Sequence, residues 1–180
     1  MADNTAQTSN APEQQSKPAQ PQSVSMNKTV AIGCDHGGYP LKLEILKYLF
    51  KHQFIVVDCG TDSASASVDY PEFATKVADA VRKGEVEFGI LMCSTGVGIS
   101  ITANKVPGIR CALATDTFVA RRAREHNDAN VLALGGSVIG TGLAVDIVDT
   151  FLNTAFSDED RHKRRIAQIK AVEDTFIGKQ

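Results

Sequence analysis

The fold is decided by residues 90–100, Ile90-Leu-Met-Cys93-Ser-Thr-Gly96-Val-Gly98-Ile-Ser100, where an apolar run delivers a cysteine to a glycine-rich turn. Such a run is typical of a buried parallel strand, and the residues from Gly98 onward predict a helix. Free backbone N–H groups at a turn of this kind favour negative charge, both on a thiolate and on a developing oxyanion. Cys93 is therefore a candidate base beside an anion cradle, and a buried structural cysteine is the alternative interpretation.

Short apolar runs alternate with amphipathic segments from Thr29 onward. Strands are predicted at 29–34, 54–59, 88–93, 109–115 and 131–134, and helices at 41–52, 71–82, 98–105, 117–125 and 143–152. A last helix at 158–176 carries four apolar residues at helical spacing, and we expect it to dock through this stripe, Ile166, Ile169, Val172 and Phe176. The alternation predicts one three-layer α/β domain that binds its ligand beyond the carboxyl ends of the strands.

The composition favours one soluble domain and gives no indication of nucleic-acid binding or of a membrane span. The chain has 180 residues, is 43% hydrophobic and carries a formal net charge of -2, as expected of one soluble domain. Nineteen basic residues against 21 acidic ones give no bias toward nucleic acid, and the apolar runs are too short for a membrane span. Residues 1–27 are rich in Gln, Ser, Asn and Pro, which predicts a disordered tail before a domain at 28–180.

The cysteines favour a reduced compartment. Cys34, Cys59, Cys93 and Cys111 show no paired spacing of the kind that binds metals, so we expect no metal site. Each lies in or at the end of a predicted strand, where a disulfide framework is not indicated. A cytoplasmic location follows as an expectation.

Polar residues follow several of the predicted strands. Asp35 and His36 come after the first strand, Cys93 ends the third, and His126 ends the helix after the fourth. We expect all four at the carboxyl edge of the sheet. Each also has a simpler interpretation: Asp35 as a turn cap, His36 as a solvated histidine, and His126 as a partner of the helix dipole.

Two further patterns have more than one interpretation. Arg161 and Arg165 are one helical turn apart and share a face, which fits either an anion site or a solvated basic surface. The turn Gly96-Val-Gly98 follows the third strand and lacks the third glycine of the dinucleotide fingerprint. Dinucleotide binding is therefore disfavoured.

Four motifs taken together resemble a known family. In order and spacing, these motifs resemble those of the type B ribose-5-phosphate isomerases. They are Ala31-Ile-Gly-Cys-Asp-His36, Val68-Asp-Tyr-Pro71, Cys93-Ser-Thr-Gly-Val-Gly-Ile-Ser100 with Ala103-Asn-Lys105, and His126-Asn-Asp128. The resemblance spans Lys28 to the C-terminal helix. It implies a Rossmann-like five-stranded parallel sheet and a homodimer with shared active sites, or a dimer of dimers, in which the C-terminal helix reaches the partner. It also implies interconversion of ribose 5-phosphate and ribulose 5-phosphate without metal or cofactor.

The resemblance assigns the proton transfer to the glycine-rich turn. Cys93 would move the proton between C2 and C1 of the sugar, while backbone amides stabilise the enediolate oxygen. Thr95 would exchange protons with the sugar oxygens. The residues concerned are Cys93, Ser94, Thr95, Gly96, Val97 and Gly98.

The remaining roles concern ring opening and substrate binding. His126 would open the furanose ring, arriving with Asn127 from the partner subunit. Asp35 would hold sugar hydroxyls and Tyr70 would wall the pocket. The phosphate would be held by His36, Arg161 and Arg165, since an arginine fork can meet two phosphate oxygens at once.

Three positions differ from the pattern of the family or of its subgroups, and alternative functions remain open. Ile99 occupies the position where a subgroup has a glutamate base, Ser94 the position where many members have glycine, and Ser137 the position where relatives usually have a phosphate-binding arginine. Related isomerases act on galactose 6-phosphate or allose 6-phosphate. The non-enzyme alternatives are a sugar-phosphate-binding protein and a redox-sensing thiol protein in which Cys34 approaches Cys93.

Overall fold

The structure is a computed structural model that describes residues 28–177. The tail predicted at 1–27 lies outside the described residues. None of the helices within 28–177 is long and apolar enough to cross a membrane. In chain order the elements are β1 (Thr29–Cys34), α1 (Tyr39–Lys51), β2 (Ile55–Asp58), α2 (Tyr70–Arg82), β3 (Phe88–Cys93), α3 (Val97–Ala103), β4 (Cys111–Leu113), α4 (Thr117–Asn127), β5 (Val131–Gly135), α5 (Thr141–Asn153) and α6 (Asp160–Ile177).

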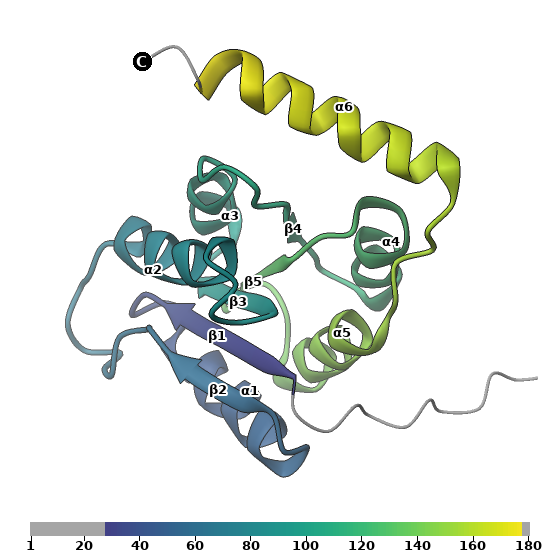
Figure 1. Cartoon of the computed structure of the whole chain (residues 1–180). Helices are drawn as coiled ribbons and strands as arrows, with labels where there is room; N and C mark the ends of the chain where they lie inside the picture. The colour runs from purple at the N-terminus through teal and green to yellow at the C-terminus, as the bar shows by residue number, and fades with distance from the viewer. Residues whose placement is uncertain (1–27, 178–180) are drawn as a thin grey trace, which may run out of the picture.

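The five strands form one sheet in the order β2-β1-β3-β5-β4 (Figure 1). All four strand pairs are parallel, as the apolar runs predicted. Val30 of β1 pairs with Phe88 of β3, and Gly89 of β3 pairs with Val131 of β5. Because every strand points the same way, the loops that follow them meet at one edge.

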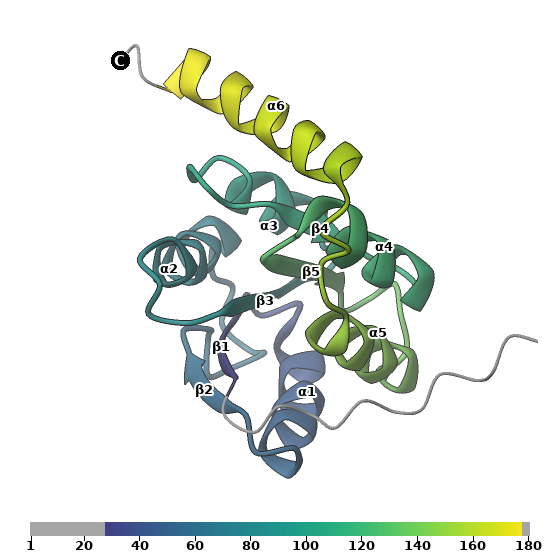
Figure 2. The same cartoon turned by 45° about the vertical axis from the view of Figure 1, so that its right-hand side comes forward.

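Helices cover both faces of the sheet (Figure 2). The buried cluster on one face joins the strands to α1, α4 and α5, with Phe151 among its largest side chains. The cluster on the other face joins them to α2 and α3, through residues such as Val77 and Ile99. Ile90 faces the first cluster and Leu91 the second, as alternation along a strand requires. The predicted three-layer domain is confirmed.

Local chemistry explains where the elements begin and end. Pro71 lies in the first turn of α2, where its missing N–H costs nothing, and the Asp116 carboxylate caps α4 by accepting from Val119 N at 2.8 Å. The predicted strand 109–115 is too long, because only Cys111–Leu113 pairs as β4. This strand is at the sheet edge, and the backbone N–H of Arg110 donates to the Asn130 side chain instead.

The C-terminal helix α6 stands apart from the three layers (Figures 1 and 2). Its apolar stripe was predicted to dock on the domain, and this is wrong for the outer part: Ile169 is 49% exposed, Val172 60% and Phe176 75%. The three side chains help to line a cavity of about 770 Å³ between α6 and the β4 edge. The described part of the chain therefore leaves this stripe uncovered.

We expect Gly38→Ala to destabilise the fold. A Cβ at Gly38 would lie 2.6 Å from the carbonyl carbon and oxygen of Met92, which belong to the central strand β3 and cannot move aside. The loss should be about 1 to 3 kcal/mol in the free energy of unfolding, measured in urea. As a control, Gly142→Ala meets open space within α5 and should cost nothing or stabilise. Equal stabilities of the two variants would contradict the close approach.

Candidate active site

Cys93 ends β3 at the centre of the carboxyl edge. Its side chain is buried, with the residue 4% exposed, and its Sγ accepts a hydrogen bond from the Gly96 backbone N–H at 3.1 Å. Gly96 has a φ of 78°, and a Cβ there would meet the Leu134 carbonyl carbon at 2.9 Å, so only glycine suits this turn. The turn thus aims a backbone donor at the sulfur.

The turn after Cys93 is tied to the loop after β5. Gly136 N donates to the Cys93 carbonyl at 2.8 Å, and Ser137 N donates to the Ser94 carbonyl at 2.9 Å. Ser94 and Thr95 are exposed, and the Thr95 hydroxyl accepts from Val97 N at 3.3 Å. Two of the amides predicted to hold a substrate oxygen, those of Gly96 and Val97, therefore have partners within the turn. The loop backbone is fixed while its side chains remain accessible.

The loop after β1 supplies an acid and an imidazole at the same edge. Asp35 is 5% exposed, and its Oδ1 accepts from Gly38 N at 3.0 Å, so the capping interpretation is observed. His36 Nδ1 accepts from Val68 N at 3.2 Å. With Nδ1 as acceptor, a neutral His36 ring carries its proton on Nε2, where it can be donated to an anion.

Tyr70 begins α2 and closes the same region. A Cβ on Gly98 would lie 2.5 Å from the Tyr70 ring, so the ring packs directly over the glycine-rich turn. The loop before Tyr70 is anchored by Lys42, whose Nζ lies 2.9 Å from the Asp58 carboxylate and 2.6 Å from the Thr61 carbonyl. The buried Lys42 ammonium is therefore paired with a carboxylate and a carbonyl, and such pairing is needed to offset the cost of burying a charge. The structure therefore brings Asp35, His36, Tyr70 and residues 93–98 together.

His126 is not part of that group. Helix α4 has 11 residues, so it spans about 16 Å and returns the chain from the carboxyl edge to the amino edge of the sheet. His126 and Asn127 end this helix just before β5 begins at Val131. The pattern-based prediction that His126 lies with Cys93 at the carboxyl edge is wrong, whereas the family resemblance implied that His126 arrives from the partner subunit. The reason is the crossover geometry of parallel strands, which puts helix ends and strand ends at opposite edges.

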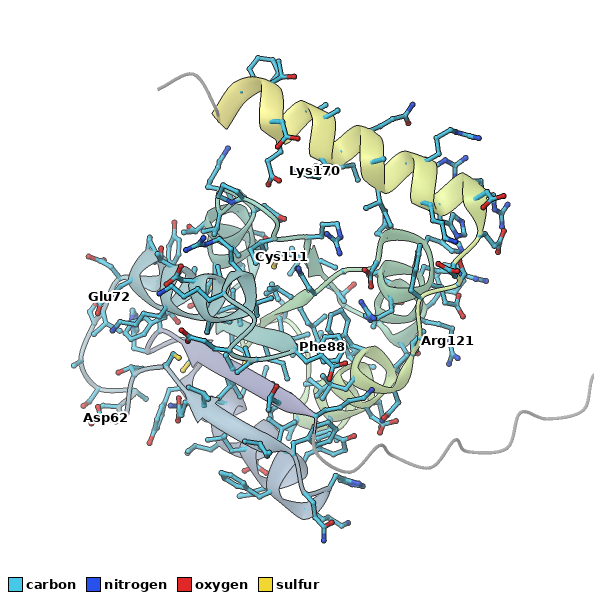
Figure 3. The ribbon with its side chains drawn as sticks, in the orientation of Figure 1. Asp62, Glu72, Phe88, Cys111, Arg121 and Lys170 are labelled. Atoms are coloured by element: carbon cyan, nitrogen blue, oxygen red, sulfur yellow. The ribbon has the colours of Figure 1, made fainter. Side chains whose placement is uncertain are left out.

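The predicted arginines lie with His126. Arg161 and Arg165 are exposed on the first turns of α6, which starts beside α4 (Figure 1). Arg161 Nε contacts the Glu159 carboxylate at 2.7 Å. Figure 3 gives the layout: Asp62 and Glu72, from the segments after β2, lie on the opposite side of the molecule from Arg121 on α4. One chain thus holds its predicted site as two separate groups.

His162 is a buried residue that the sequence pattern does not single out. It belongs to the basic run 161–165, which predicts exposure, yet it is only 1% exposed. Its ring stacks on that of His126, with the centroids 4.2 Å apart. The basic run could not predict this contact, because the contact depends on how α6 packs against α4.

The second cysteine proposed for redox chemistry is in the wrong place. Cys34 packs in the cluster with α1 and α5, whereas Cys93 packs in the cluster with α2 and α3, so their side chains point to opposite faces of the sheet. Burial raises the pKa of Cys34 to about 12, against the opposing effect of Lys42. A thiol of this kind is inert, and the predicted approach of Cys34 to Cys93 is wrong.

Comparisons with known proteins identify relatives of the chain. Residues 30–169 match the family described as Ribose/Galactose Isomerase. The chain is 48% identical over 146 residues to ribose-5-phosphate isomerase B of Escherichia coli strain K12, covering 81% of this chain and 97% of that protein. The Clostridium thermocellum ribose-5-phosphate isomerase B structure is 53% identical with a TM-score of 0.80, covering 82% and 99% of the two chains. A Mycoplasma genitalium ribose-5-phosphate isomerase B structure with bound ribulose-5-phosphate is 42% identical with a TM-score of 0.78, covering 83% and 98%.

Oxidation should not link Cys34 to Cys93. Because the two thiols face opposite sides of the sheet, diamide treatment of the native protein is expected to give no disulfide between them. Peptide mapping by mass spectrometry under non-reducing conditions measures this. Detection of a Cys34–Cys93 disulfide in protein that keeps its native circular dichroism would revive the redox-sensor hypothesis.

Proposed function

Because the chain belongs to the ribose/galactose isomerase family, we propose that it interconverts ribose 5-phosphate and ribulose 5-phosphate through an enediolate, with Cys93 as the base. The observation that carries this assignment is the Cys93 sulfur at the end of the central strand, with the Gly96 N–H donating to it at 3.1 Å. The reaction requires a base of this kind, since it moves one proton between neighbouring carbons. The fold and the turn support it together.

The proton transfer follows from the turn geometry. In the open-chain aldose, the Cys93 thiolate removes the proton from C2, and the bonding electrons form the C1–C2 double bond of the enediolate. The C1 carbonyl electrons move to O1, which gains a proton while the C2 hydroxyl loses one. The thiol then returns its proton to C1 as O2 becomes the carbonyl, which gives the ketose. Backbone amides of the turn other than those of Gly96 and Val97 offset the negative charge on the enediolate oxygen, and the accessible Thr95 hydroxyl exchanges protons with the sugar oxygens.

Substrate binding uses the rest of the carboxyl edge. The buried Asp35 carboxylate accepts from sugar hydroxyls, and Tyr70 walls the pocket over Gly98. His36, whose Nδ1 is occupied by Val68 N–H, donates its Nε2 proton to the phosphate. These three side chains would orient the sugar so that C2 faces the sulfur.

The second half of the site would come from another copy of the chain. His126, Asn127, Arg161 and Arg165 lie at the amino edge and cannot serve the Cys93 of their own chain. In a homodimer they would meet the partner subunit's carboxyl edge, where His126 opens the ring and the arginines hold the phosphate. The exposed stripe of α6 and the cavity of about 770 Å³ beneath it support a second copy as the covering surface. The free cysteines fit the cytoplasmic location that we propose.

Turnover measurements test the reaction and its substrate. The purified chain should convert ribose 5-phosphate to ribulose 5-phosphate in the presence of a chelator. Galactose 6-phosphate is the competing substrate, because the family description includes galactose isomerases. A higher kcat/KM for galactose 6-phosphate than for ribose 5-phosphate would make galactose 6-phosphate the substrate. If the chain converts neither sugar, the hypothesis that remains is a protein that binds sugar phosphates without catalysis.

Replacing the base should abolish the reaction. Cys93→Ala removes the proton acceptor without disturbing Gly136 N and Ser137 N, which hold the turn through backbone carbonyls. We expect kcat to fall by about 10² to 10⁴, while the binding of ribulose 5-phosphate, followed by calorimetry, stays near that of the unmodified chain. Near-normal turnover by Cys93→Ala would remove Cys93 from the mechanism.

Mixed dimers test whether the site is shared. Cys93→Ala and His126→Asn are each expected to be inactive toward ribose 5-phosphate. After the two are unfolded and refolded together, half of the dimers carry one intact site, so activity should return to about a quarter of the unmodified level. Refolding each variant alone is the control. Absence of recovery, in mixtures shown by native mass spectrometry to contain mixed dimers, would contradict sharing.

Ser137 tests the phosphate side of the pocket. Its backbone N–H bonds the Ser94 carbonyl and its side chain is exposed at the carboxyl edge, so an arginine fits there without changing the turn. Ser137→Arg should lower KM for ribose 5-phosphate, since a charge-assisted hydrogen bond contributes about 1.5 to 3 kcal/mol. Because the phosphate is bound about equally in ground and transition states, kcat should not change. An unchanged KM would mean that the phosphate is already fully held.

A further inference from the structure

His162 is a buried histidine to which the proposed chemistry gives no task. It lies in the first turn of α6, its residue is 1% exposed, and its ring plane is inclined by 32° to that of His126 on α4 at a centroid distance of 4.2 Å. His126 itself is half-buried. The two imidazole rings therefore contact each other between α4 and α6, and His162 is the more deeply buried of the two.

A second contact fixes the His162 ring. Its Nδ1 lies 2.7 Å from Ser157 Oγ, and the Ser157 backbone N–H donates to the Glu125 carbonyl at 3.1 Å, next to His126 in the chain. A buried imidazole is costly unless its nitrogens are paired, and Ser157 satisfies one of them. The ring is thus anchored to the same end of α4 whose histidine it covers.

Burial and the surrounding charges act on the pKa of His162. Burial lowers its pKa, the His126 ring lowers it further, and Glu159 acts in the opposite direction. Arg161 and Arg165 on α6 add positive charge, and Arg122 on α4 lies 3.4 Å from His126 Nε2. A neutral ring can stack on His126 without adding a second positive charge beside a group that must exchange protons.

We propose that His162 is a positioning residue for His126, holding its ring in the orientation that reaches the furanose oxygen in the partner subunit's site. This role rests on the proposed function, in which His126 opens the ring. A purely structural His162 would matter only for the packing of α6. Its loss would then weaken the phosphate contacts of Arg161 and Arg165 and affect both directions of the reaction alike.

The two directions of the reaction separate these roles. Ribose 5-phosphate must be opened from its furanose form, whereas ribulose 5-phosphate has none. The comparison uses kcat at saturation, because the equilibrium constant fixes the ratio of kcat/KM in the two directions. His162→Leu fills the space without a ring, and His162→Phe keeps a flat ring without nitrogens. We expect kcat for ribose 5-phosphate to fall about tenfold with leucine and less than about threefold with phenylalanine, while kcat for ribulose 5-phosphate stays within about twofold in both.

Three controls accompany the measurement. His52→Leu removes another stacked histidine, 4.5 Å from the Tyr48 ring on α1 and away from both groups of site residues, and should leave both kcat values unchanged. On a His126→Asn background, adding His162→Leu should cause no further loss with ribose 5-phosphate, since a residue that acts through His126 has nothing left to position. Circular dichroism and native mass spectrometry check fold and assembly of each variant.

The outcomes are distinct. Equal losses in both directions, or losses that add to those of His126→Asn, would overturn the positioning role. Leucine and phenylalanine variants with the same kcat for ribose 5-phosphate would also overturn it, because the ring is the part that is claimed to matter. An unmodified chain that does not turn over ribose 5-phosphate would refute the proposed function, and the positioning role with it.

Discussion

Parallel pairing of β3 with β1 on one side and β5 on the other is the constraint on which the rest of the structure depends. It forces the loops after these three strands to meet at one edge. The Asp35 N–H donates to the Met92 carbonyl at 3.3 Å, and the Gly136 N–H donates to the Cys93 carbonyl at 2.8 Å. The Cys93 sulfur is placed by this framework, and the left-handed turn at Gly96 adds the donor that faces it.

The same pairing divides the site. Parallel strands can be joined only by a crossover, and the crossover helix α4 carries His126 to the opposite edge from Cys93. A single chain therefore presents Cys93, the proposed base, with Asp35, His36 and Tyr70 at one edge, and His126 with two arginines at the other. A homodimer that joins unlike edges would have a complete site at each end of its interface. The uncovered stripe of α6 is consistent with this assembly, since only another surface can bury it.

Buried polar groups hold the parts that must not move. Lys42 fixes the loop before Tyr70 through Asp58 and Thr61, and the Asp35 carboxylate fixes the turn before α1. His162 does the same for the end of α4 through Ser157 and His126. Each is paired, because an unpaired polar group in the interior would cost more than it contributes.

The sequence by itself determined the elements and half of the site. Strands, helices and the turn that follows Cys93 depend on neighbouring residues, and apolar periodicity and glycine positions record such local preferences. The alternation of strands with helices then indicates parallel pairing. Strand order, the opposite faces of Cys34 and Cys93, the separation of His126 from Cys93 and the burial of His162 depend on contacts between distant segments. The local sequence pattern does not predict those contacts. Tertiary structure alone decided them, because crossover geometry and packing set which ends of the elements meet.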